Sequence, residues 1–452
     1  MHLICPLIRS DAVKRLSKTL PWAGRVLILS SIPALGMAQA DRQLPATSAM
    51  VQAANSKATS MTELRAEQII ATILANNTSF LAAQRSRLAS QSGVQAAQAL
   101  PNPRFDLIQG RNVARIPGVM PGPMQSWSIS QTIENPNARS ARIDAATATV
   151  EENNELVRLT RNALISEARL RIFQTLLHQA MVDAGAEDVQ LLEQVRERVS
   201  LRVASGEAAR YEIIKADAEI ITARERLQTA RLMVEQNKIQ LNQMASGQLP
   251  AQWRLLGGLN DTIELLSLEE IHQLVMVHNP EVRVLQTQLS KSQAMLRSAE
   301  ASRLPGVELR YTQNKDIEIR QGQWGIGMQI PLLDRRSGVI AQASAELSRA
   351  QIQLDGRKAE IKQEIYFTWK SMEMARLRIE ALSQGSIREA EAALRVAQAA
   401  YRFGERGILD VLDAQRVLRS VRADLIQARY QLQEARVKLD QLIGQDMDFT
   451  QF

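Results

Sequence analysis

The sequence repeats itself once, and a duplicated unit restricts the possible folds more than any single motif does. The matched residues keep nearly the same spacing over most of the chain, and the two halves meet near residue 250. We therefore expect two similar structural units. The matched pairs are Trp127 with Trp324, Arg139-Ser140 with Arg336-Ser337 and Ile143 with Ile340 at a spacing of 197, then Gly206-Glu207 with Gly404-Glu405, Ala216 with Ala414 and Leu241 with Leu439 at 198.

Each half shows the same order of patterns: a helix, two strands and two long helices. The opening helices begin at capping boxes, Ser60-x-x-Glu63 and Ser267-x-x-Glu270, in which the side chains bond free backbone amides. They end before Pro101 and Pro305, because proline disfavours helix in the preceding residue. The first half then carries about seven extra residues, and Pro117-Gly118 and Pro121-Gly122-Pro123 predict a surface loop there.

Four short runs have apolar residues at every second position, which predicts strands. Such alternation suits a membrane barrel with one face in lipid, and it equally suits a small soluble sheet packed on helices. Four short strands are too few to close a barrel within one chain. The apolar positions are Phe105 and Leu107; Trp127, Ile129 and Ile133; Val307, Leu309 and Tyr311; and Trp324, Ile326, Met328 and Ile330.

Two helical patterns of unusual length follow the strands, at about 138–201 and 337–400. Sixty helical residues span about 90 Å, far more than a globular domain requires. Apolar residues recur on one face of the first, which predicts a packing seam with arginine and glutamate on the wet side. The seam residues are Leu156, Leu159, Leu164, Ile165, Leu170, Phe173 and Leu177.

The first forty residues have the composition of a secretory signal peptide. Basic residues from Lys14 to Lys18 precede an apolar stretch, Val26 to Leu35, and the small residues of Ala38-Gln39-Ala40 form a cleavage site, so the mature chain is expected to begin near Asp41. A membrane anchor is the alternative, but the stretch falls short of the roughly 20 residues that span a bilayer. No later segment offers 18 consecutive apolar residues.

Charge and cysteine content argue against several classes of protein. Residues 1–40 contain five basic residues and one acidic residue, so their removal lowers the formal net charge from +7 by 4 to +3. The remaining arginines alternate with glutamates along the helices, which argues against a nucleic-acid partner. The single cysteine, Cys5, lies in the signal, so we expect neither a disulfide nor a lipid-modified N-terminus in the mature protein.

The sequence lacks a motif that carries enzymatic chemistry. There is no nucleophile elbow, phosphate-binding glycine loop or zinc-binding pattern. The histidines of the mature chain, His178, His272 and His278, have spacings that make no ligand cluster. We therefore expect a protein that is not an enzyme and that has no cofactor and no metal site of its own.

One segment carries a specific resemblance. Residues 401–415, Tyr-Arg-Phe-Gly-Glu-Arg-Gly-Ile-Leu-Asp-Val-Leu-Asp-Ala-Gln, resemble the helix-turn-helix tip of TolC-like outer-membrane efflux ducts, and residues 204–216 repeat this more loosely. Pro101-Asn102-Pro103, Asn279-Pro280 and residues 330–334 are also similar to that family, so the resemblance covers nearly all of 60–445. The first tip, 206–219, is similar to the CzcC-type members that serve heavy-metal pumps.

The resemblance implies a mainly α fold with a small β part. Each chain of a homotrimer would give four strands to a twelve-stranded barrel in outer-membrane lipid and its antiparallel helices to a long periplasmic α-barrel. The partners implied are a periplasmic adaptor protein and an inner-membrane RND-type exporter. The expected organisation is a signal peptide (1–40), a periplasmic extension (41–60), a first repeat (61–247), a linker (248–266), a second repeat (267–445) and a tail (446–452).

The resemblance also implies roles for residues at the tips. Asp410 and Asp413 match pore-lining aspartates, and three copies would place six carboxylates around one constriction, an arrangement that favours cations. The alternative is an acidic helix start favoured by the helix dipole. Lys215 stands at the position of the first repeat that matches Asp413, so the two tips are electrostatically unlike.

Three further residues match the links that keep the family's tip closed: Tyr401, Arg406 and the first-repeat partner Glu212. Ordinary surface ion pairs are the alternative reading. Gly206, Gly404 and Gly407 are expected to be turn residues with positive φ. Together with Glu207 and Glu405 they form the exposed tips where an adaptor would dock.

The sequence thus favours an outer-membrane channel component of a tripartite efflux system that exports divalent heavy-metal cations. A duct for drugs or for type I protein secretion is the alternative within the family. A periplasmic coiled-coil scaffold without a pore is the alternative of another class.

Overall fold

A computed structural model describes residues 62–113, 117–118, 120–259 and 266–444, so the expected signal peptide, N-terminal extension and C-terminal tail lie outside the described residues. The chain is mainly helical with a small β part, as predicted. In order, the elements of the first half are β1 (Thr62–Arg65), α2 (Ala66–Asn76), α3 (Thr78–Gln98), β2 (Arg104–Asn112), β3 (Gly122–Ile133), α4 (Pro136–Ala204) and α5 (Arg210–Met244).

The second half follows the same plan. Its last strand leads into a long helix that contains one π-helical turn, η1, between α8 and α9. The elements are β4 (Trp253–Leu256), α6 (Leu268–His278), α7 (Pro280–Ala301), β5 (Val307–Lys315), β6 (Arg320–Met328), α8 (Ser337–Ala381), η1 (Leu382–Ser386), α9 (Ile387–Arg402) and α10 (Ile408–Ile443).

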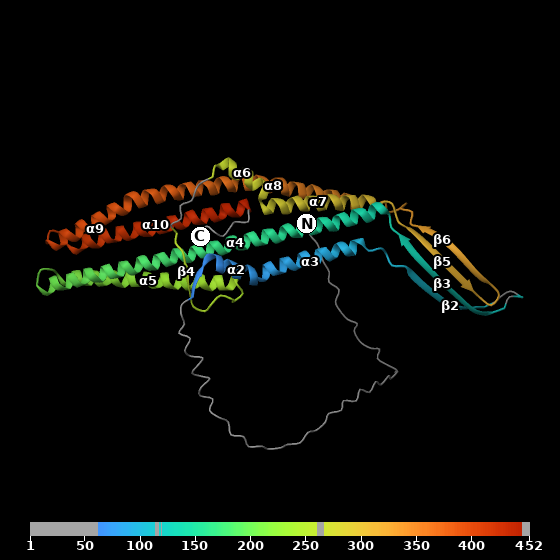
Figure 1. Cartoon of the computed structure of the whole chain (residues 1–452), viewed down its shortest axis with the longest axis horizontal. Helices are drawn as coiled ribbons and strands as arrows, with labels where there is room; N and C mark the ends of the chain where they lie inside the picture. The colour runs from blue at the N-terminus through green and yellow to red at the C-terminus, as the bar shows by residue number, and fades with distance from the viewer. Residues whose placement is uncertain (1–61, 114–116, 119, 260–265, 445–452) are drawn as a thin grey trace, which may run out of the picture. The chain divides into compact units, whose positions relative to one another are not determined.

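The long helices confirm the prediction. Helix α4 has 69 residues, which corresponds to about 100 Å of helix. It begins at Pro136, which fits the first helical position, and the side chain of Asn135 accepts a hydrogen bond from the amide of Asn137 at 3.0 Å. In Figure 1 the long helices run side by side. The four-stranded sheet lies at one end, and the turns that connect α4 with α5 and α9 with α10 lie at the other.

The opening helix of each half is broken in two, which the sequence patterns did not predict. Asn77 separates α2 from α3, and Asn279 separates α6 from α7. Each asparagine is extended and caps the helix that follows: Asn77 Oδ1 accepts from the amide of Phe80 at 3.2 Å, and Asn279 Oδ1 from that of Val282 at 3.0 Å. Each side-chain amide also donates to a carbonyl near the end of the last helix of its own half.

One predicted capping box is present and one is wrong. In the second half, Ser267 Oγ accepts from the amide of Glu270 at 3.3 Å, and the Glu270 carboxylate accepts from the amide of Ser267 at 3.0 Å. In the first half, Glu63 lies in β1, and Ser60 is outside the described residues. The helix begins at Ala66 because backbone pairing of β1 with β4 holds this segment extended.

The four-stranded sheet has the order β2-β3-β5-β6 and is antiparallel throughout. The four predicted strands are confirmed, although Ile330 lies beyond β6. The expected loop is shorter than predicted, since Gly122 and Pro123 pair with Asn112 and Arg111 in the β2–β3 hairpin. One aromatic side chain from each strand contacts the next, at centroid distances of 6.3, 5.5 and 4.8 Å along Phe105, Trp127, Tyr311 and Trp324.

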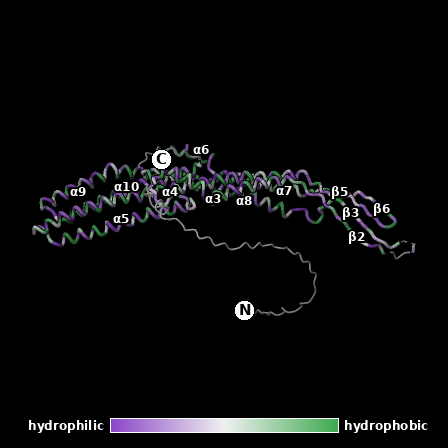
Figure 2. Tube along the Cα trace, turned by 60° about the horizontal axis from the view of Figure 1, so that its bottom comes forward, coloured by the Kyte–Doolittle hydropathy of each residue, from purple (hydrophilic) through white to green (hydrophobic). Residues whose placement is uncertain are grey.

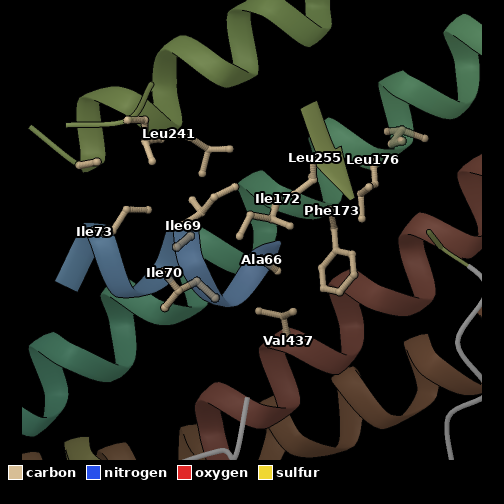
Figure 3. Close-up of a cluster of buried hydrophobic side chains, with 14 of the residues drawn as sticks. Ala66, Ile69, Ile70, Ile73, Ile172, Phe173, Leu176, Leu241, Leu255 and Val437 are labelled. Atoms are coloured by element: carbon tan, nitrogen blue, oxygen red, sulfur yellow. The ribbon is translucent and has the colours of Figure 1, made fainter. Parts of the chain in front are cut away.

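The main hydrophobic core lies where the two halves meet. Figure 3 shows isoleucines of α2 packed against α4, with contributions from α5, β4 and α10. Strand β4, inside the expected linker 248–266, pairs in parallel with β1 and thereby brings Leu255 into this core. The predicted seam of α4 is confirmed in part: Phe173 and Leu177 are buried, and Leu164, Ile165 and Leu170 pack against this cluster. Glu155 and Arg169, however, are buried and do not lie on the wet side.

Hydrophobic and hydrophilic residues alternate along the helices rather than forming long apolar stretches (Figure 2). None of the described helices has a window apolar enough to cross a lipid bilayer. Apolar residues occupy narrow stripes between neighbouring helices, as in coiled-coil packing.

Candidate functional site: the paired helical tips

In each half, a long helix ends in a tight turn, after α4 in the first half and after α9 in the second. Both turns lie at the end of the helices remote from the sheet (Figure 1). Gly206 has a φ of 80° and Gly404 a φ of 74°, a conformation that favours glycine. The amide of Glu207 donates to the carbonyl of Arg202 at 2.8 Å, and that of Glu405 to the carbonyl of Ala400 at 3.0 Å. The two turns therefore have the same construction.

Gly407 does not have the positive φ that was expected. Its φ is −80°, and it is the N-cap of α10, so this position requires a helix start rather than a left-handed turn. Both tip glutamates are exposed. Docking of an adaptor on these residues stays a prediction.

A hydrophobic cluster beneath the turns joins the two hairpins. It contains side chains from α4, α5, α9 and α10, so each tip is packed against the other half of the chain. The buried members near the turns are Val195, Val199, Ile220, Tyr401, Ile408, Val411 and Leu412. This packing positions the polar groups at its border.

The structure brings Tyr401 and Glu212 together, although they come from different halves. The phenol of Tyr401 donates to Glu212 Oε2 at 3.1 Å. Tyr401 is only 5% exposed. Burial raises the pKa of its phenol to about 12, and the negative charge of Glu212 acts in the same direction. The tyrosine is therefore held as a neutral hydrogen-bond donor.

Arg202 also contacts Tyr401, a role that the sequence analysis did not predict. Its Nη1 donates to the backbone carbonyl of Tyr401 at 2.8 Å, and its guanidinium lies 4.7 Å from the centre of the Tyr401 ring. The same side chain lies 3.5 Å from the Glu207 carboxylate. The repeat gave no signal for this role, because Ala400 occupies the matching position of the second half.

Arg406 does not join this group within the described chain. Its Nη1 donates to Asp410 Oδ2 at 3.3 Å, one turn along the same segment, and its side chain is 66% exposed. Arg202 therefore links the two hairpins within the described chain. Arg406 precedes the N-cap of α10, one turn before Asp410, and its role as a gate link stays a prediction.

The two candidate pore aspartates each have an arginine partner. Asp410 binds Arg406, and Asp413 Oδ1 accepts from Arg416 Nη1 at 2.8 Å. Arg416 also binds Glu219 of α5, and this hydrogen bond holds the pKa of the Glu219 carboxyl below its usual range. Residues 406–416 therefore present two aspartates flanked by two arginines.

The corresponding part of the first tip is different. The ammonium group of Lys215, which stands where the second half has Asp413, lies 5.5 Å from the ring centre of Tyr211. Glu212 stands where the second half has Asp410, so of the two aspartate positions only that of Asp413 has the opposite charge in the first tip. Among the residues with described positions, no three histidine, cysteine, aspartate or glutamate side chains gather as metal ligands would.

Comparison with known proteins places this architecture among membrane channels. A family model described as outer membrane efflux protein matches residues 69–247 and 271–445. The cobalt-zinc-cadmium resistance protein CzcC of Cupriavidus metallidurans is 24% identical over 84% of this chain and 90% of its own length.

Two solved structures show the same fold at low sequence identity. The outer membrane protein VceC of Vibrio cholerae has a TM-score of 0.71 at 17% identity, covering 84% of this chain and 96% of that one. CusC, described as a protein that forms a transmembrane channel, has a TM-score of 0.68 at 17% identity, covering 84% and 91%. The sheet, the long helices and the paired tips are thus a shared architecture.

Proposed function

The chain belongs to the outer membrane efflux protein family, and we propose that it is the outer-membrane duct of a tripartite system that exports divalent heavy-metal cations. A periplasmic adaptor and an inner-membrane RND-type exporter would be its partners. The exporter would supply the energy, and the duct would pass its cargo without covalent chemistry. Its two repeats, residues 61–247 and 267–445, would each give two strands to the membrane part and two long helices to the periplasmic part.

The observation that carries the proposal is the open sheet. Among the described strands, β2 pairs only with β3 and β6 only with β5, so both edges keep free backbone groups. On β6, Trp324 is 84% exposed and Ile326 79% exposed. Unpaired edges and apolar side chains are costly in water. Three copies would join these edges into a closed barrel of twelve strands whose apolar face meets lipid.

The helices support the same assembly. Helix α5 packs on α4, and its other face exposes Ile214, Ile221 and Ile239. Helix α8 likewise exposes Phe367, Met374 and Leu377. Packing of α5 against α8 of a second copy would cover both faces and continue the layer of helices into a periplasmic tube.

The tips would form the gate of this tube. The hydrogen bond from Tyr401 to Glu212 and the contacts of Arg202 with Tyr401 would hold the second tip on the first in the closed state. Asp410 and Asp413 of three copies would line the constriction. Since each aspartate has an arginine partner, we expect a moderate preference for cations rather than a strong one.

The likeness to CzcC supports a metal cargo over drugs or secreted proteins. Growth of a deletion strain on a panel of divalent metals and lipophilic drugs, with complementation by the intact gene, tests this. We expect sensitivity to metals alone. Sensitivity to drugs alone would be consistent with an efflux duct but would contradict the proposal that its cargo is metal. A water-soluble periplasmic monomer in place of an outer-membrane trimer would contradict the duct and favour a scaffold.

A further inference from the structure

The two faces of the four-stranded sheet differ in composition. Side chains alternate along each strand, so the pairing register decides which residues share a face. The four aromatic side chains that contact one another lie on one face, which we call the aromatic face. From the helical end of the strands, this face presents successive rows of mainly apolar residues. The rows are Ile133, Val307 and Met328; Gln131, Leu309 and Ile326; Phe105, Ile129, Tyr311 and Trp324; and Leu107, Trp127, Gln313 and Gly322.

The opposite face of the sheet carries charges in pairs. Arg104 Nε donates to the carboxylate of Asp106 at 2.9 Å, and Arg310 Nη2 donates to that of Glu308 at 2.8 Å. Each arginine is two residues from its acid, so both members of a pair lie on this face. Strands β2, β3, β5 and β6 contain no other acidic residue. The charges of the opposite face therefore cancel.

The other cations of these strands all lie on the aromatic face, beyond its apolar rows. They are Arg111, Lys315 and Arg320, and all three are exposed. Lys315 and Arg320 stand directly opposite each other in the register of β5 and β6. No carboxylate with a described position makes an ion pair with any of the three. This end of the aromatic face is thus purely basic.

The acidic residues of the adjacent turn are engaged by backbone amides. Asp316 Oδ1 accepts from the amides of Glu318 and Ile319 at 2.9 and 2.6 Å, and Glu318 Oε1 accepts from the amide of Met120 at 3.3 Å. Like charges directly opposite in an antiparallel pair are destabilising. The pairing of Lys315 with Arg320 therefore favours an anion from outside the chain.

The cations lie at a definite level of the proposed barrel. Lys315 follows Tyr311 by four residues and Arg320 precedes Trp324 by four, which is about 14 Å along a strand. Aromatic residues of membrane barrels lie at the border between hydrocarbon and headgroups, so the cations reach the headgroups. These strand ends are remote from the helices (Figure 1). In the proposed barrel they therefore face the outer leaflet.

We propose that Arg111, Lys315 and Arg320 bind the phosphate groups of a phosphorylated glycolipid in the outer leaflet. Clusters of basic residues at a membrane surface attract anionic headgroups, and the guanidinium of arginine matches the geometry of phosphate. In the proposed trimer, β6 of one copy pairs with β2 of the next. Lys315 and Arg320 would then lie near Arg111 of the next copy, with one lipid at each junction. This inference rests on the proposed barrel.

Binding of bisphosphorylated lipid A to purified full-length trimers tests the site, with bound lipid counted by native mass spectrometry. The Lys315→Gln, Arg320→Gln double variant should bind this lipid at least about tenfold more weakly than the unmodified protein. The matched control is Arg104→Gln, Arg310→Gln, which removes the same charge from the opposite face of the same sheet and should bind normally. Unchanged binding by the first variant would overturn the site.

Unmodified trimers provide a second test that needs no substitution. They should bind bisphosphorylated lipid A at least about tenfold more tightly than dephosphorylated lipid A. Equal affinity for the two lipids would show that acyl chains alone are recognised and would overturn the proposal. Displacement of the lipid by an equal concentration of inorganic phosphate would indicate a site for free anions and would also contradict it.

The outcomes separate the lipid site from the proposed function. Trimers that conduct cations but do not distinguish the two lipids would contradict the lipid site alone. A water-soluble monomer that binds no detergent would contradict the barrel itself. A heat-stable trimer on a gel shows that a variant has folded, and the comparison of lipids on unmodified trimers decides the question if a variant does not assemble.

Discussion

The phenol of Tyr401 donates a hydrogen bond to Glu212, 3.1 Å away and 189 residues earlier in the chain. It thereby joins the end of α9 to the start of α5, one element from each half. Both residues border the cluster that packs the tips together. This contact is one of several directional bonds between the two hairpins, with those of Arg202 to the Tyr401 carbonyl and of Arg416 to Glu219.

Tyr401→Phe should loosen the gate while leaving the ring packed. A hydrogen bond to a charged group contributes about 1.5–3 kcal/mol, so the open fraction should rise at least about tenfold. The measurement is sensitivity of cells to a large antibiotic that the outer membrane normally excludes. Tyr211→Phe, at an exposed position of the first tip, is the control and should change nothing. Equal sensitivity of the two variants would remove Tyr401 from the gate.

Arg202→Ala should also increase antibiotic entry, because it removes a hydrogen bond to the Tyr401 carbonyl and a cation from the face of its ring. Arg202→Lys should give an intermediate effect, since lysine keeps the charge but loses the planar guanidinium. Arg198→Ala, an exposed change one turn earlier on α4, removes the same charge as a control. A lysine variant as leaky as the alanine variant would argue that the geometry of the guanidinium, and not its charge, holds the tip.

The gate should resist mild alkali and fail in strong alkali. The pKa of Tyr401 is raised from its ordinary value of 10.0 to about 12 in the closed state. A raised pKa means that the stabilisation of the closed state is complete below pH 10 and is lost as the pH rises toward 12. Bilayer conductance should therefore be flat between pH 7 and 10 and then increase. The Tyr401→Phe variant lacks the ionisable group, so an increase of the same size there would contradict this assignment.

Replacing both Asp410 and Asp413 by alanine should lower cation selectivity, with a reversal potential in a salt gradient shifted toward that of an anion-preferring pore. The reason is that the variant keeps Arg406 and Arg416 without their carboxylate partners. Asp424→Ala removes a carboxylate from the same helix farther from the tip and serves as the control. An unchanged reversal potential in the double variant would exclude these aspartates from the constriction.

Much of the fold could be predicted from the sequence because the two halves repeat the same patterns. Each half therefore supported the assignment of elements in the other. The four strands and the long helices were predicted from alternation and helical periodicity. The predictions of local structure were wrong where contacts between distant residues determine that structure. Backbone pairing with β4 makes Glu63 a strand residue despite its capping-box spacing, and the breaks at Asn77 and Asn279 depend on side-chain amides that bond distant carbonyls.

The candidate site was predicted only in part, for a related reason. Tyr401 and Glu212 were found because the second tip closely resembles a known family. Arg202 was missed because its partners are a backbone carbonyl and an aromatic face, and neither leaves a spacing pattern in the sequence. Arg406 is predicted to link neighbouring helices; within the described residues it contacts Asp410 in the first turn of α10, and the link stays a prediction.

The most direct test of a gated duct is the current through purified full-length protein in a planar bilayer. We expect trimers of the Tyr401→Phe, Arg202→Ala double variant to carry a steady current that prefers cations, while the unmodified protein opens rarely under the same conditions. Absence of current from the double variant, in trimers that remain heat-stable, would contradict a gated duct.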